Sequence, residues 1–278
     1  MIRDITLGQY YPEYSIIHKL DPRLKIIAAL VYISSLFLVN SFLGYVIVVA
    51  SLAAVIILSK VPLRFILRGL KPIIIIIAFT FVLNMFMTKG DVLLLLGPLT
   101  LTKQGLYNAG FMAIRLILLI IGSSLLTLTT KPMKLTDGIE SLLKPLRRFG
   151  LPAHELAMMM SIALRFIPTL LDETDKIMKA QMARGADFET GSLVRRAKAL
   201  IPLMVPLFVG AFRIAQDLAM AMEARCYRGG EGRTKLNALK LRGRDWAAAA
   251  IVAAYLGIMI CARIFLPALV TSILGFVI

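Results

Sequence analysis

Two arginines stand in the same short pattern, Ala-x-x-Ala-Arg, at the ends of two long apolar segments. Arg184 is followed by Gly185, and Arg225 is followed by Cys226. Residues three or four apart share one face of a helix, so each arginine stands on a face that alanine keeps small. A guanidinium is a planar set of donors that suits a carboxylate or the carbonyl groups at a helix end. The chemistry expected at these positions is docking into a groove.

A structural explanation also exists for either arginine alone, because a cation in the last turn of a helix interacts favourably with the helix dipole. The repetition of the pattern favours docking. Gly185 can end a helix in the left-handed conformation at little cost and Cys226 cannot, so we expect two related but distinct helix ends. The predicted docking residues are Ala183, Arg184, Gly185, Ala224, Arg225 and Cys226.

No pattern for bond-making chemistry is found in the sequence. The phosphate-binding pattern G-x-x-x-x-G-K-[ST] is missing, and His18 and His154 are too far apart to form a metal-binding spacing. Cys226 and Cys261 fall in segments assigned to different compartments, so we expect no disulfide. We predict a non-catalytic protein without a cofactor or metal site.

Arg115 is a further candidate functional residue, because it lies inside an apolar stretch, several residues from either end. Charges within a membrane are costly and are usually functional or paired. The alternative is that the side chain extends to the membrane surface.

The composition indicates an integral membrane protein. Hydrophobic residues make up 59% of the chain, and its mean hydropathy is +0.82, whereas soluble domains contain roughly 45–50% apolar residues. The net charge of +16 is explained by basic loops on the cytoplasmic side, and no nucleic-acid-binding module is present, so we expect no nucleic-acid partner. The predicted fold is an all-α polytopic membrane protein.

Five apolar stretches are predicted to span the membrane, each approaching the required ~20 residues. The first two adjoin, and we expect a turn at Asn40 and Ser41 because together they are too long for one span. The basic loops place the N-terminus inside and the C-terminus outside. The five stretches are Leu24–Val39, Phe42–Leu58, Pro72–Met87, Leu106–Leu128 and Trp246–Leu266.

Two further apolar stretches, Leu156–Leu171 and Ala199–Met222, are interrupted by prolines and charged residues. We interpret them as amphipathic helices on the cytoplasmic face, with a shorter helix before them, instead of as spans. A count of seven spans is the alternative. The predicted organisation is a four-helix membrane part over residues 1–130, a cytoplasmic coupling region of about three helices over 131–244, and a final span within 245–278.

Four motifs together resemble the transmembrane T component of energy-coupling factor (ECF) transporters. The resemblance covers nearly the whole chain, from about Gly8 to the last span, and Cys226 departs from the glycine that is usual in the family. Within the first motif, Asp21 and Pro22 are typical of a helix N-cap followed by proline in the first turn. The motifs are Ser15…His18-x-Leu20-Asp21-Pro22-Arg23-x-Lys25, Leu164-Arg165-Phe166-Ile167-Pro168, Ala180-Gln181-x-Ala183-Arg184-Gly185-Ala186-Asp187-Phe188 and Ala221-Met222-x-Ala224-Arg225.

The resemblance implies a function and a set of partners. Such transporters import vitamins or transition-metal ions, with a small membrane S component that captures the substrate and two ABC-type ATPases that hydrolyse ATP. The T component joins them, and its cytoplasmic helix ends occupy grooves on the ATPases. By resemblance, the Arg184 end would enter one ATPase and the Arg225 end the other.

Two other functions are alternatives to this one. Gly191 followed by Ile201-Pro202-Leu203 is faintly similar to the coupling loop of an ordinary ABC permease that a binding protein supplies, but the Glu-Ala-Ala lead of that loop is missing. An enzyme acting on lipids would need clustered acids, and Asp172, Glu173 and Asp175 are more typical of a solvated helix turn.

Overall fold

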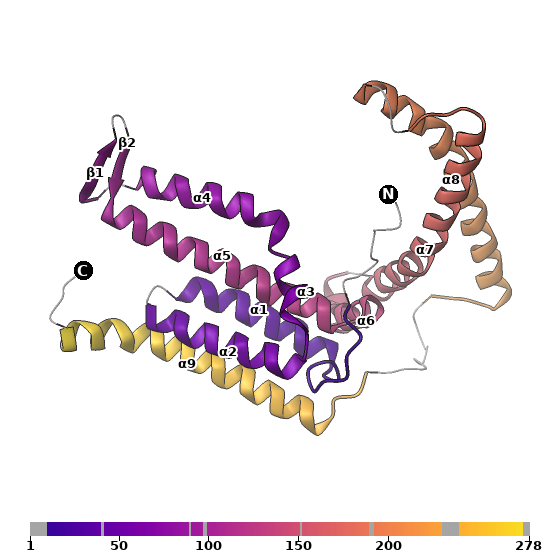
Figure 1. The fold of residues 1–278 in the computed structure, drawn as a ribbon. Helices are drawn as coiled ribbons and strands as arrows, with labels where there is room; N and C mark the ends of the chain where they lie inside the picture. Colours follow the sequence, from indigo (N-terminus) through magenta and orange to yellow (C-terminus); the bar gives the residue numbers. More distant parts are fainter. Residues whose placement is uncertain are drawn as a thin grey trace. The chain divides into compact units, whose positions relative to one another are not determined.

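The computed structural model describes residues 10–39, 42–88, 90–96, 99–150, 152–188, 192–229 and 239–274. Helices dominate this part of the chain, and an antiparallel pair of short strands is the exception (Figure 1). The helices belong to two compact units, residues 8–138 with 239–278 and residues 139–238. The prediction of a predominantly helical fold is confirmed.

The first unit is a bundle in which α5 packs against α1, α2 and α4, and α9 packs against α1 and α2 (Figure 1). A hairpin of β1 and β2 connects α4 to α5. The elements are α1 (Pro22–Leu38), α2 (Phe42–Ser59), α3 (Leu63–Arg68), η2 (Lys71–Ile73), α4 (Ile74–Met87), β1 (Val92–Leu96), β2 (Leu99–Thr102), α5 (Lys103–Thr129), the start of α6 (Pro132–Leu143), and α9 (Gly243–Leu274).

The core of this bundle is apolar and includes Leu36 of α1, Val48 of α2, Leu118 of α5 and Met259 of α9. Gly122 of α5 allows α1 to approach closely, since a Cβ there would lie 2.1 Å from the ring of Tyr32. Small residues commonly permit such contacts between membrane helices.

The second unit contains the end of α6, η3 (Lys144–Phe149), α7 (Ala153–Ala183) and α8 (Leu193–Ala224). The corner between α6 and α7 is held by a contact of 3.2 Å between His154 Nδ1 and Glu140 Oε1. Both long helices continue through their prolines, which are Pro168 in α7 and Pro202 and Pro206 in α8.

Helices α7 and α8 pack against each other in antiparallel fashion. Gln181, near the end of α7, donates from Nε2 to the carbonyl oxygen of Pro202, near the start of α8, at 3.5 Å. Further along, Ile162 and Phe166 of α7 and Leu218 of α8 line a shared apolar groove of about 290 Å³. The C-terminal ends of the two helices therefore lie at opposite ends of the pair.

Five helical stretches of the described chain are long and apolar enough to cross a membrane, but they are not the five predicted ones. Three correspond to predicted spans: Leu63–Met87, Lys103–Thr129 and Gly243–Ile264. The other two, Ala153–Ala183 and Lys198–Ala224, belong to α7 and α8, which the sequence placed on the cytoplasmic face. These two helices qualify as possible spans by length and composition alone, and their location on the membrane surface stays a prediction.

The first two predicted spans are separate helices, α1 and α2, of 17 and 18 residues. The predicted turn at Asn40 and Ser41 lies outside the described residues. Two helices, instead of one long span, agree with the sequence-based interpretation.

Candidate docking site

The end of α7 is a left-handed helix cap built around Arg184. Arg184 is the C-cap residue, and Gly185 follows it with φ of +87°. The N–H of Gly185 donates to the carbonyl oxygen of Met182 at 2.9 Å, and that of Ala186 donates to Gln181 at 3.0 Å. These two bonds form a Schellman motif, which satisfies carbonyl groups that a helix end leaves unpaired.

The end of α8 has the same hydrogen bonds around Arg225. The N–H of Cys226 donates to the carbonyl oxygen of Glu223 at 2.8 Å, and that of Tyr227 donates to Met222 at 3.0 Å. Cys226 has φ of +54°, which places a residue with a Cβ in the left-handed region. Both helices end in the same cap, and α8 accepts the steric cost of the Cys226 side chain, so the two ends differ in steric cost and not in cap geometry.

All six predicted docking residues are exposed. Around Gly185 the space is open, because a Cβ there would meet nothing within 4 Å. The cap presents Ala, Arg and the left-handed residue together at the tip of each helix, with the guanidinium in solvent. The structure does not bring the two tips together, since α7 and α8 are antiparallel.

Arg115 of α5 is paired within the bundle. Its Nε donates to the hydroxyl of Tyr45 at 2.9 Å, and its Nη2 donates to the carbonyl oxygen of Val39 at 3.1 Å. Val39 is the C-cap of α1, so the guanidinium satisfies an orphan carbonyl and interacts favourably with the negative end of that helix. The guanidinium also lies 5.8 Å from the ring centroid of Phe37. These contacts give Arg115 a structural role in joining α1, α2 and α5.

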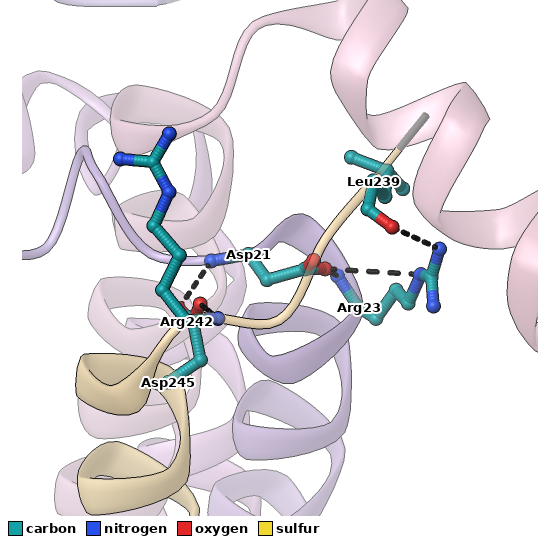
Figure 2. A network of polar contacts seen from close by, with 5 residues as sticks. All are labelled: Asp21, Arg23, Leu239, Arg242 and Asp245. Atoms are coloured by element: carbon teal, nitrogen blue, oxygen red, sulfur yellow. Dashed lines mark hydrogen bonds and ion pairs between the residues drawn. The ribbon is translucent and has the colours of Figure 1, made fainter. Parts of the chain in front are cut away.

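The N-terminal motif joins the start of α1 to the start of α9 (Figure 2). Asp21 is the N-cap of α1, with Oδ1 accepting from the N–H of Arg23 at 2.9 Å, which confirms the predicted cap and the proline after it. The N–H of Asp21 in turn donates to Oδ1 of Asp245 at 2.9 Å. Arg23 extends to the carbonyl oxygen of Leu239 at 3.5 Å.

Asp245 is a structural residue that the sequence analysis missed. Its Oδ2 accepts from the N–H of Arg242 at 2.7 Å, while its own N–H donates to the Arg242 carbonyl at 2.8 Å. An acidic side chain bonded back to the N–H that precedes its helix is half of a capping box. Its place in the first turn of α9 is a signal that could have identified this cap, but nothing local indicates the bond to Asp21.

Lys25 fixes the segment before α1 to the end of α5, and the His18 ring forms bonds within that segment. The buried Nζ of Lys25 donates to the Thr129 carbonyl at 2.9 Å. His18 Nε2 lies 3.1 Å from the Tyr11 carbonyl oxygen and Nδ1 lies 2.7 Å from Ser15 Oγ, so the neutral ring donates from Nε2 and accepts at Nδ1. Partial burial, and then the charge of Lys25, lower the pKa of His18 below its usual 6.5.

Within the described part of the chain, no three His, Cys, Asp or Glu side chains gather as a metal site would require. Cys226 and Cys261 are free and exposed.

Comparison with known proteins identifies the family. The CbiQ family, described as cobalt transport protein, matches residues 13–236. The energy-coupling factor transporter transmembrane protein EcfT of Thermosediminibacter oceani is 61% identical over 247 residues, covering 89% of this chain and 93% of that protein. The protein of the same name from Clostridium kluyveri is 58% identical, covering 95% and 99%, and that from Bacillus subtilis is 49% identical, covering 88% and 93%.

The family match includes both helix ends and every helix before α9, and the comparisons confirm the resemblance inferred from the motifs. The chain belongs to the family of energy-coupling factor transporter transmembrane proteins, the T components of these transporters, and is a multi-pass protein of the cell membrane.

Proposed function

We propose that this T component is a non-catalytic scaffold that couples two cytoplasmic ABC-type ATPases to an S component. The transporter would import a vitamin or a transition-metal ion, and the S component would select it. Residues 1–130 and 245–278 would lie in the membrane, and residues 131–244 would form the cytoplasmic coupling region.

The observation that carries this proposal is that the two helix ends have the same cap geometry. Arg184 and Arg225 hold the same position in two Schellman caps, with a small alanine before each arginine. An exposed guanidinium on a small, rigid tip fits a groove that offers carboxylate or carbonyl oxygens. One such end is explained by helix capping, whereas two equivalent ends suit two similar ATPase grooves.

The antiparallel packing of α7 and α8 supports two separate docking sites. Pro202 lies beside the end of α7, and Arg225 is 23 residues further along α8. At ~1.5 Å per helical residue, the two tips are roughly 35 Å apart along α8. A single ATPase groove cannot hold both tips, so each arginine would contact its own subunit.

The apolar surface of α8 supports a membrane partner. Its large hydrophobic side chains are exposed over much of the helix, as in Phe208 with 57% and Phe212 with 68% of their surface accessible. Met159 of α7 adds a flexible apolar side chain that can adapt to a moving partner. The S component would lie against this surface and tilt when the ATPases move α7 and α8.

The test combines pull-down, ATP hydrolysis and uptake. Arg184→Ala and Arg225→Ala should each reduce uptake and uncouple ATP hydrolysis from it, because each removes one docking guanidinium. The double variant should fail to copurify with the ATPases. Matched controls are Lys179→Ala and Arg228→Ala, which remove an exposed cation near the same two ends.

Normal copurification and normal uptake by the double variant would disprove the docking proposal. Loss of assembly in the control variants to the same degree would also disprove it, because general positive charge would then suffice.

A further inference from the structure

A small basic cavity lies where the segment before α1 meets the end of α5 and the start of α6. Its volume is about 20 Å³, which is room for one oxygen-sized group. All of it belongs to the first compact unit. The polar groups that line it include Lys25, Lys131, Lys134, His18 and Thr130.

The three lysines of this cavity differ in their bonding. Lys25 is 7% exposed, and its Nζ donates to the carbonyl oxygens of Thr129 and His18 and to Thr130 Oγ1 at 2.9 to 3.4 Å. Its hydrogen atoms are therefore used within the protein, and it contributes charge behind the cavity. Lys131 and Lys134 are exposed and are free to contact a ligand at its mouth.

Few negative charges balance these lysines. Lys131 has its Nζ 5.5 Å from the ring centroid of Tyr10, and among the described residues neither Lys131 nor Lys134 has an ion pair. The nearby carboxylate of Asp21 lies 3.9 Å from Arg23 Nε, which balances its charge, and the carboxylate of Glu13 acts on His18. The cavity thus has an excess of positive charge at its mouth and behind it.

We propose that this cavity binds the phosphate group of an anionic lipid, with one phosphate oxygen in the cavity and the others between Lys131 and Lys134. In the orientation that the basic loops predict, the cavity lies at the cytoplasmic ends of α1 and α5, at the depth of lipid phosphates. Ile16 and Met133 lie in the adjoining segments and are 64% and 58% exposed, which leaves apolar surface for an acyl chain. Free phosphate shares this chemistry, and the experiment separates the two sources.

The experiment measures lipid binding to the purified full chain by native mass spectrometry in an uncharged detergent. The probes are dioctanoyl phosphatidylglycerol, dioctanoyl phosphatidylcholine and inorganic phosphate as a competitor. The test variant is Lys131→Gln/Lys134→Gln. The control variant, Lys179→Gln/Lys198→Gln, removes the same charge from exposed positions of α7 and α8.

We expect phosphatidylglycerol to bind more tightly than phosphatidylcholine. Each lysine near an anionic surface strengthens binding by roughly fivefold, so the test variant, which lacks two, should lose about 25-fold, while the control keeps its affinity. If inorganic phosphate competes with the lipid, the cavity also binds free phosphate. If it does not compete, the cavity binds the phosphate group only as part of a lipid.

The proposal is overturned if neither phosphatidylglycerol nor phosphate binds, if phosphatidylglycerol binds no better than phosphatidylcholine, or if both double variants behave alike. Unchanged thermal unfolding of the two variants would show that the exposed substitutions leave the fold intact.

Discussion

Gly185 and Cys226 occupy equivalent positions in two helix caps, each directly after the C-terminal arginine and each with a positive φ. Only the glycine adopts this conformation without steric cost, because it has no Cβ. For Cys226 the cost is about 1–2 kcal/mol. The two helix ends therefore share one geometry, and we expect them to differ in stability.

Replacing Cys226 by glycine should stabilise the end of α8 by about 1 kcal/mol, because the steric cost is removed and part of the gain is lost to backbone entropy. Hydrogen exchange at the Tyr227 amide, which bonds to Met222, should slow by roughly fivefold. Gly185→Cys should have the opposite effect on the Ala186 amide.

Cys226→Ala is the control, since it removes the thiol and keeps the Cβ, and its exchange should match that of the native chain. Faster exchange in Cys226→Gly would contradict the assigned conformation.

Asp245→Ala should destabilise the first unit by about 2–4 kcal/mol, because it leaves the N–H groups of Asp21 and Arg242 without their carboxylate acceptor. Thermal unfolding in detergent measures the loss. Asp245→Asn keeps one acceptor oxygen and should lose about half as much. Equal stability of Asp245→Ala and the native chain would rule out a stabilising link between α1 and α9.

Arg115→Lys should also reduce stability, by about 1 kcal/mol, because one ammonium cannot reproduce the two bonds that Nε and Nη2 make to Tyr45 and Val39. Tyr45→Phe removes only the first of these bonds and serves as the comparison. Unfolding and uptake are measured on the same samples. Lost uptake with native stability in Arg115→Lys would indicate a functional charge instead of a structural one.

Stability should fall as the pH drops below about 6.5, in part because of His18. The pKa of His18 is lowered in the folded protein by partial burial and by Lys25, so the unfolded chain binds a proton at higher pH than the folded one. The stability that depends on neutral His18 is complete above pH 6.5 and is lost as the pH falls toward and below the folded pKa.

The measurement is the pH dependence of thermal unfolding between about pH 5 and 7.5, compared between the native chain and His18→Gln. The variant should show a shallower fall toward low pH. A slope of the same size in both proteins would exclude His18 as the source.

Most of the architecture was predictable because its causes are local. Apolar stretches of the required length specify the membrane helices, and Asp21 with Pro22 specifies the start of α1 through a cap of three consecutive residues. The two Ala-x-x-Ala-Arg patterns were likewise recognisable, since each concerns a single helix face. Whether α7 and α8 cross the membrane or lie on its surface was harder to predict, because their composition suits either location.

By itself, the sequence determined the membrane class, most of the helix-forming stretches, the family and the two matching Ala-x-x-Ala-Arg patterns, because hydropathy and capping act over a few neighbouring residues. Only the tertiary structure decided the partners of Arg115, the bond from Asp21 to Asp245 across 224 positions, and the antiparallel packing that separates Arg184 from Arg225. Such outcomes depend on groups that only folding brings together.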